Sequence, residues 1–302
     1  MIIPCDFIIR VVHEIKVSRE IFIRAGPYLF IKVTRVKKDI INDRAGSSDT
    51  RINKLLSDAG VCSRRQADRL IEQGKVLIDG RPACAGQRVK PGQKVLVDGK
   101  PVSRQEKLVL IALNKPRGIV CTTDRKREKN NIVDFVHYPT RIYPVGRLDK
   151  ESEGLILLTN DGSLVNRIMK ASSGHEKEYQ VRVDKPLTDE FIRRMSSGVP
   201  ILDTVTRPCR VKKTGRSTFS IILTQGLNRQ IRRMCEYLGY HVEELKRVRI
   251  MNIELGHLKT GQWRRVTGEE IMGLKAAFIR DAETGNKAKD KRSGYARGKN
   301  GR

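Results

Sequence analysis

Two short apolar runs constrain the fold of this chain of 302 residues more than any other feature. One is Leu-Val-Leu-Ile-Ala-Leu, which starts at residue 108, and the other is Leu-Ile-Leu-Leu-Thr at residues 155–159. Apolar runs of this length, bounded by polar and turn-forming residues, are typical of strands in the interior of a sheet. Further predicted strands alternate with predicted helices up to about residue 280. We therefore expect an α+β domain over residues 106–280.

A smaller module is predicted over residues 47–105. Ile52 and Leu56 lie at helical spacing, and Ser63 with Gln66 forms the capping-box pattern that starts a second helix. Two runs follow, Lys-Val-Leu-Ile-Asp-Gly and Gln-Lys-Val-Leu-Val-Asp-Gly, and each is typical of a short strand that ends in an Asp-Gly turn. The sequence thus predicts two helices followed by strands.

The charge of the chain indicates a polyanionic partner. Lys and Arg number 61 against 34 Asp and Glu, a formal net charge of +27. Nucleic acid is the first partner to consider, since the sequence has no uninterrupted apolar span of membrane length. A solvated helix face is the ordinary interpretation of a basic run, but the predicted helices of the small module have few acids nearby, and we favour RNA contact. The basic residues concerned are Arg51, Lys54, Arg64, Arg65 and Arg69.

Several other classes of function are disfavoured by the sequence. The six cysteines are scattered, without a C-x-x-C pair or zinc-ligand spacing. The sequence contains no P-loop, no glycine-rich dinucleotide motif and no H-E-x-x-H, so we expect neither a cofactor nor a metal. Charged residues interrupt the apolar stretch at the N-terminus, which does not resemble a secretory signal. A cytoplasmic protein is expected.

Both ends of the chain differ from the two predicted domains. Residues 1–46 contain short runs of Ile and Val separated by charges, which predict strands with no evident pairing partner. We interpret them as an N-terminal extension without an assigned function. Residues 281–302 are basic and nearly free of apolar side chains, and we expect a disordered tail that adds non-specific attraction to RNA.

Two segments carry candidate chemistry. Asp149 lies in the charged loop Gly-Arg-Leu-Asp-Lys-Glu-Ser-Glu-Gly, just before the second apolar run. By itself, such an Asp is usually a solvated turn residue. In Gln-Gly-Leu-Asn-Arg-Gln-Ile-Arg-Arg-Met, Asn228 is a candidate helix cap, and the predicted helix places Arg229 and Arg232 opposite its apolar face. Arginines in a first helical turn run against the helix dipole, and they indicate an anion site there.

Three motifs in this order resemble the RsuA family of pseudouridine synthases. They are GRLDKESEGLILLTNDG, KEYQV and LNRQIRRM, and the likeness runs from about residue 48 to 272. The small module resembles the S4 RNA-binding domain. The stretches IALNKPRGIVCTT, QGLNRQIRRMCEYLGY and GQWRRVT look most like the RluF branch, which acts on large-subunit (23S) ribosomal RNA. The resemblance implies a mixed, largely antiparallel sheet in the catalytic domain.

The resemblance also implies roles for individual residues. Asp149 matches the nucleophile, Tyr179 the active-site aromatic residue, and Arg232 the basic partner of the carboxylate. Lys177 lies two residues before Tyr179 on the same strand face, and we expect it to contact phosphate. The positions that match RNA contacts are Arg147, Leu148, Lys150, Arg229, Gln230 and Ile231.

The expected reaction converts uridine to pseudouridine, which a carboxylate can promote by attacking the ribose or by removing a sugar proton. The residues leave both routes open. One alternative is a non-catalytic RNA-binding or ribosome-assembly factor, but binding alone would need the arginines and not Asp149. A second alternative is the same chemistry on small-subunit ribosomal RNA or transfer RNA. The expected form is a monomer.

Overall fold

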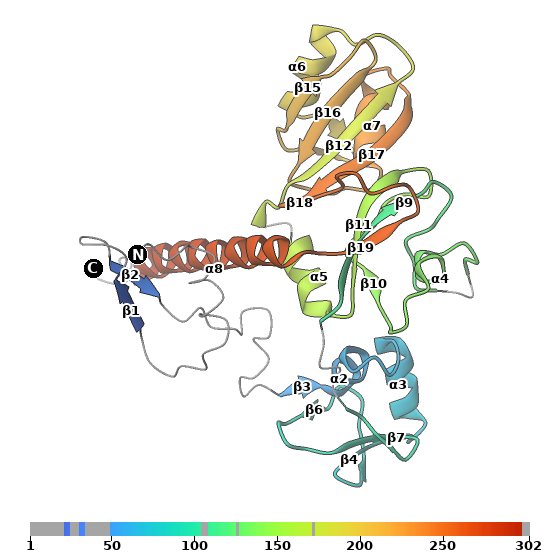
Figure 1. Cartoon of the computed structure of the whole chain (residues 1–302), viewed down its shortest axis with the longest axis vertical. Helices are drawn as coiled ribbons and strands as arrows, with labels where there is room; N and C mark the ends of the chain where they lie inside the picture. The colour runs from blue at the N-terminus through green and yellow to red at the C-terminus, as the bar shows by residue number, and fades with distance from the viewer. Residues whose placement is uncertain are drawn as a thin grey trace, which may run out of the picture. The chain divides into compact units, whose positions relative to one another are not determined.

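The computed structural model describes residues 21–24, 30–33, 49–103, 108–124, 127–170 and 173–297 (Figure 1). The chain divides into two compact units, Met1–Gly46 and Ser47–Arg302. In the first unit, β1 (Ile21–Arg24) pairs antiparallel with β2 (Phe30–Val33). The expectation of strands without a partner is wrong for these two, because they pair with each other. The apolar run near residue 10 lies outside the described residues.

The small module contains the two predicted helices, α2 (Ile52–Asp58) and α3 (Arg64–Glu72). The backbone N–H of Gln66 donates to Ser63 Oγ at 3.2 Å, so Ser63 caps α3 as predicted. Apolar side chains of both helices pack on those of the following strands. The buried members of this core are Ile52, Leu56, Cys62, Ala67, Ile71, Val76, Ile78, Ala83, Val89, Val95 and Val97.

Two tight turns shape the sheet of this module. Asp79 and Gly80 have φ of 48° and 80°, and Asp98 and Gly99 have 47° and 74°. Positive φ at both central residues suits a two-residue hairpin turn, which confirms the predicted Asp-Gly turns. The strands are β3 (Thr50–Arg51), paired with β6 (Arg88–Val89), and an antiparallel sheet of β5 (Arg81–Pro82), β4 (Val76–Ile78), β7 (Val95–Val97) and β8 (Lys100–Pro101).

The large domain is built on a nine-stranded sheet with the order β15-β16-β12-β17-β11-β9-β19. Strand β10 is added on β11 and β18 on β17. All pairings are antiparallel except that of β11 with β17, which confirms the mixed, largely antiparallel sheet. The strands are β9 (Leu110–Lys115), β10 (Tyr143–Pro144), β11 (Glu153–Thr159), β12 (Lys177–Val183), β15 (Arg210–Lys213), β16 (Thr218–Leu223), β17 (Val242–Ile250), β18 (Ile253–Glu254) and β19 (Trp263–Arg265).

The predicted interior strands are buried as their composition requires. Every residue of β9 is buried, and so is β11 from Gly154 onward. The helices of the domain are α4 (Ile132–Val136), α5 (Gly162–Met169), α6 (Asp189–Ser197), α7 (Gln230–Tyr237) and α8 (Gly268–Arg297). Helices α6 and α7 pack on the β12 and β16 region, and α5 and the start of α8 pack on β11. A separate hairpin joins β13 (Pro200–Ile201) to β14 (Thr204–Val205).

Side chains cap the starts of two helices in the large domain. Asp161 Oδ1 accepts from Ser163 N at 2.8 Å, and Asp161 thereby caps α5. At α8, Thr267 and Glu270 form a capping box. Thr267 N donates to Glu270 Oε2 at 2.8 Å, and Glu270 N donates to Thr267 Oγ1 at 3.2 Å.

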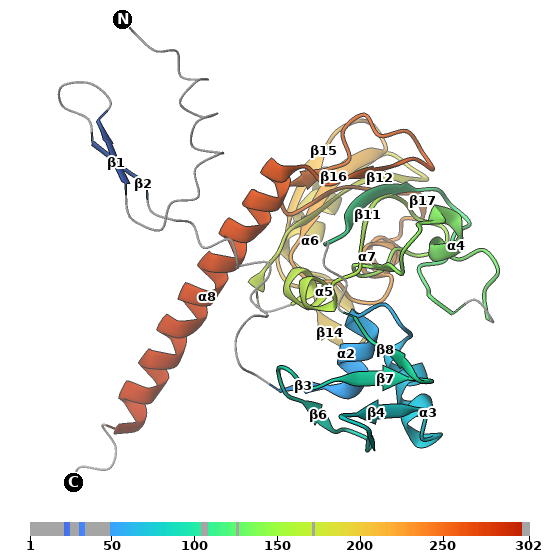
Figure 2. The same ribbon diagram turned by 60° about the horizontal axis from the view of Figure 1, so that its bottom comes forward.

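Helix α8 is one continuous helix that extends to Arg297 (Figure 2). This differs from the expected disordered tail over residues 281–297. Ala, Lys and Arg, which favour helix, make up much of the segment. Asp281 Oδ2 also lies 2.8 Å from Nε2 of the buried His175, which ties the helix to the domain. Residues 298–302 lie outside the described part of the chain.

A glycine permits the parallel contact of β11 with β17. Gly154 has φ of 101°, and a Cβ there would lie 2.7 Å from Arg247 N and closer still to Arg247 O. Gly154→Ala should therefore lower the free energy of unfolding by about 3 kcal/mol, from backbone strain and overlap together. Gly92→Ala is the control, since Gly92 has φ of 89° with open space around it, and it should cost about 1–2 kcal/mol. Equal losses in urea denaturation would contradict the close approach.

Candidate active site

The loop that carries Asp149 is held by its backbone. Leu148 N donates to Cys121 Sγ at 3.3 Å, Ser152 N donates to Asp149 O at 3.1 Å, and Gly118 N donates to Lys150 O at 2.8 Å. The Leu148 side chain is buried, and Asp149 itself is half-buried. The loop is thus anchored in the core, and the carboxylate lies at the edge of the core.

Asp149 lines a pocket of about 450 Å³. The walls come from the Asp149 loop, the end of α5, strands β12 and β17, and the segment from β16 into α7. The structure brings together eight of the residues singled out from sequence. They are Arg147, Leu148, Asp149, Lys177, Tyr179, Arg229, Gln230 and Ile231.

Lys177 and Tyr179 enter the pocket from β12. Lys177 is buried, and burial lowers the pKa of its ammonium below the ordinary value, with Arg247 lowering it further. Tyr179 is half-buried and packs against two hydrophobic clusters of the domain. The Tyr179 ring therefore contributes both to core packing and to the pocket lining.

Arg247 on β17 is a pocket residue that the sequence reasoning missed. Its side chain is buried, its Nε donates to Leu155 O at 2.7 Å, and its Cζ lies 6.0 Å from the centre of the Tyr179 ring. Its Nη2 is buried without a hydrogen-bond partner. An unpaired N–H in a polar pocket is a donor available to a ligand. The signal in the sequence was a basic residue between the apolar residues Leu245 and Val248.

Arg232 does not occupy the position that the resemblance implied. It is buried, its Nη1 donates to Val242 O at 3.0 Å, and its Nε lies 3.9 Å from Glu151 Oε2. It is absent from the pocket lining. The expectation that Arg232 lies on the exposed face of α7 is wrong. In this structure its carboxylate neighbour is Glu151, and its pairing with Asp149 stays a prediction.

The start of α7 explains this difference. Arg229, at the cap position, has φ of 49°, so the helix begins only at Gln230. Asn228, the expected cap, does not hold the cap position, and no side chain donates or accepts a capping hydrogen bond there. Gln230, the first residue of the helix, accepts from Leu227 N at 3.0 Å through its Oε1. The arginines therefore separate. Arg229 reaches the pocket and lies 3.1 Å from Glu151, where its hydrogen bond lowers the pKa of the carboxyl, while Arg232 turns toward β17.

The basic residues of the small module lie on its surface. Arg51, Arg64, Arg65 and Arg69 are exposed, and Lys54 is half-buried and forms an ion pair with Asp58 at 2.8 Å. Lys150, in the Asp149 loop, is also exposed and is not a pocket residue. No helix in the described part of the chain is long and apolar enough to span a membrane.

Comparison with known proteins identifies the family. A model described as RNA pseudouridylate synthase matches residues 109–237, and an S4 domain model matches residues 50–95. The dual-specificity RNA pseudouridine synthase RluF of Escherichia coli O157:H7 is 54% identical over 255 residues, which cover 83% of this chain and 88% of that protein. The chain belongs to the RNA pseudouridylate synthase family. It is an isomerase with an S4 domain, and the RluF-like resemblance is confirmed.

Two further relatives agree with this family. The ribosomal large subunit pseudouridine synthase B of Bacillus subtilis is 35% identical over 234 residues, which cover 75% of this chain and 96% of that protein. A solved structure described as a pseudouridylate synthase superposes with a TM-score of 0.56 at 27% identity, covering 74% of this chain and 99% of its own. The alternative of a non-catalytic binding factor is thereby answered in favour of a synthase.

The lowered pKa of Lys177 predicts a pH-dependent stability difference. The native pKa lies below 10.5, the ordinary value, so between the two pKa values the unfolded chain holds more protons and stability rises with pH. We expect Lys177→Met to be more stable than the wild type at pH 7 by about 0.5–2 kcal/mol. The gain should shrink as pH approaches 10.5.

The measurement is the free energy of unfolding from pH 7 to pH 10.5. Lys212→Met on the edge strand β15, where the side chain is exposed, is the matched control. A stability difference of the same size and pH dependence in the control would refute the assignment to burial.

Proposed function

We propose that the protein converts a specific uridine to pseudouridine in large-subunit (23S) ribosomal RNA, with Asp149 as the nucleophile. The observation that carries the proposal is the pocket itself. Asp149 is the acidic residue among its lining, where it meets Tyr179 and the cations Lys177, Arg229 and Arg247. The name of the Bacillus subtilis relative, a ribosomal large subunit synthase, supports the RNA class.

The chemistry suits these residue types. The N-glycosidic bond from N1 to the ribose breaks, and N1 gains a proton. The uracil turns, and a carbon–carbon bond forms from C5 to the ribose as C5 loses its proton, with no net change of oxidation state. A carboxylate can attack the ribose or remove a proton from it. The pocket provides one carboxylate on a loop with a fixed backbone, which suits either route.

The target nucleotide must leave the RNA stack to reach Asp149. Extrusion of a base costs a few kcal/mol of unstacking, and stacking on Tyr179 together with phosphate contacts would offset part of it. Arg147 is exposed at the pocket, and Arg229 is half-buried. These two side chains, with Gln230 and Ile231, would hold the backbone of the RNA around the flipped nucleotide. Arg232 lies outside the pocket lining and would act indirectly, by holding Glu151 of the Asp149 loop.

A second RNA substrate class is supported by one observation. The Escherichia coli relative is named a dual-specificity synthase. Transfer RNA is our candidate for the second substrate, and mapping pseudouridines in ribosomal and transfer RNA from cells without the protein tests both classes together.

Replacement of Asp149 should abolish the reaction and spare binding. We expect Asp149→Ala and Asp149→Asn to lower tritium release from RNA labelled at uridine C5 by ~10⁴-fold or more, since the nucleophile is lost. Glu151→Gln, a carboxylate change in the same loop, should lower it less than ~10-fold. RNA affinity is measured in parallel. Near wild-type release by Asp149→Ala would refute the assignment.

Basic residues of the S4 domain should govern the salt dependence of RNA binding. Loss of each phosphate contact reduces the slope of log affinity against log salt by about one. We expect Arg65→Gln with Arg69→Gln to reduce the slope by about two and to leave turnover at saturating RNA unchanged. An unchanged slope would remove these two arginines from the RNA interface.

A further inference from the structure

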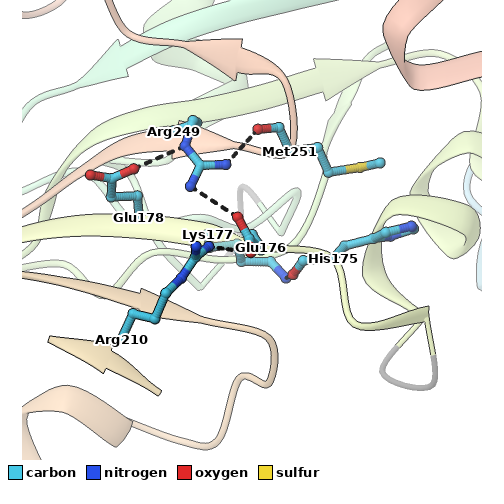
Figure 3. Close-up of polar contacts among 7 residues, drawn as sticks. All are labelled: His175, Glu176, Lys177, Glu178, Arg210, Arg249 and Met251. Carbon is cyan, nitrogen blue, oxygen red and sulfur yellow. Dashed lines mark hydrogen bonds and ion pairs between the residues drawn. The ribbon is translucent and has the colours of Figure 1, made fainter. Parts of the chain in front are cut away.

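A cluster of charged side chains, which we call the Arg249 cluster, lies at the start of β12 and outside the pocket lining. Arg249 Nε donates to Glu178 Oε2 at 2.9 Å, its Nη2 to Glu176 Oε2 at 3.1 Å, and its Nη1 to Met251 O at 2.8 Å (Figure 3). Arg210 of β15 also pairs with Glu176. Arg249 is 19% exposed. One guanidinium thus joins three acceptors on two chain segments.

The cluster and the pocket use opposite faces of the same strand. Successive residues of a strand point to opposite sides. Lys177 and Tyr179 line the pocket, whereas Glu176 and Glu178 bind Arg249. Contacts that hold Glu176 and Glu178 in place therefore also hold two pocket residues. Lys177 lies between the two glutamates, and Tyr179 follows Glu178.

Strand β17 contains a β-bulge at this point. Glu178 is paired with Arg249, but Tyr179 is paired with Arg247, so Val248 is an extra residue. In a regular strand Arg247 and Arg249 would point to the same face. The bulge turns them to opposite faces, with Arg247 in the pocket and Arg249 in the cluster. Bulges are common beside active sites, where they re-aim a side chain.

We propose that the Arg249 cluster is a positioning clamp that holds this bulge and so aims Lys177, Tyr179 and Arg247 at the substrate nucleotide. The inference rests on the proposed function of the pocket. Arg249 lies on the first residue pair beyond the bulge and binds a glutamate on either side of Lys177. The planar fork of Arg can serve separate acceptors at once, which a Lys ammonium cannot do in the same geometry.

The test compares Arg249→Met with Arg249→Lys in tritium release. A misplacement of about 1 Å in an active site costs about 100-fold in rate. We expect Arg249→Met to lower kcat by about 100-fold, with KM within about 3-fold, because phosphate contacts elsewhere carry the affinity for RNA. Arg249→Lys keeps one ion pair, and its kcat should be about 10-fold higher than that of Arg249→Met.

Arg264→Met is the matched control. Arg264 binds Glu270 through two hydrogen bonds of 2.8 and 2.7 Å at the start of α8, with 32% exposure. Its loss should destabilise the fold and leave kcat within about 2-fold. Equal kcat losses in both Met variants, or a wild-type kcat in folded Arg249→Met, would overturn the clamp. Glu178→Gln, which removes one charge and keeps the other bonds of Arg249, replaces Arg249→Met should that variant not fold.

Amide hydrogen exchange separates this inference from the proposed function. In Arg249→Met we expect faster exchange in β12 and β17 and unchanged exchange in β9. If the wild-type protein releases no tritium, the proposed function is refuted, but the clamp is not. The hydrogen-exchange result then decides whether the Arg249 cluster holds the bulge. Unchanged protection of β12 and β17 would overturn it.

Discussion

The contact on which the site depends is the parallel pairing of β11 with β17, which rests on two residue pairs, Glu153 with Lys246 and Gly154 with Arg247. It joins the strands β15, β16, β12 and β17 to the strands β11, β9 and β19. The loop before β11 supplies Asp149, and the other half of the sheet supplies Tyr179 and Arg247. A glycine at 154 is needed because any larger residue would meet the backbone of Arg247.

The cations around Asp149 are held at a cost in stability. Lys115 is fully buried, and its ammonium donates to Pro116 O and Ile119 O at 2.9 Å each. Lys177 and Arg247 are buried in the pocket wall, and Arg247 keeps one N–H unpaired. Buried charge without a full set of partners disfavours the folded state. An RNA phosphate or a uracil oxygen would complete the partners of Lys177 and Arg247, which line the pocket, so part of the binding energy would offset that cost.

Much of the framework could be predicted from the sequence, but the aim of individual arginines could not. The apolar runs predicted β9 and β11, and a capping box predicted the start of α3. Asp149 and Tyr179 were brought together by the resemblance and not by periodicity. Arg247 escaped because a period of two cannot show the bulge at Val248. Arg232 was misplaced because a helical wheel cannot show that Arg229 has a positive φ and delays the start of α7.

The division between pocket and surface bears on how a target uridine is chosen. Every uridine offers the same base and ribose, so a pocket lined by Asp149, Tyr179 and Arg247 has no chemical means to distinguish one site from another. Recognition must then come from side chains outside the pocket, which meet the folded RNA through its phosphates and shape. Exposed side chains outside the pocket include Arg65 and Arg69 of the S4 domain and Lys150 of the Asp149 loop. Under the proposed function, one pocket would serve two RNA classes if both present their uridine to the same basic surface.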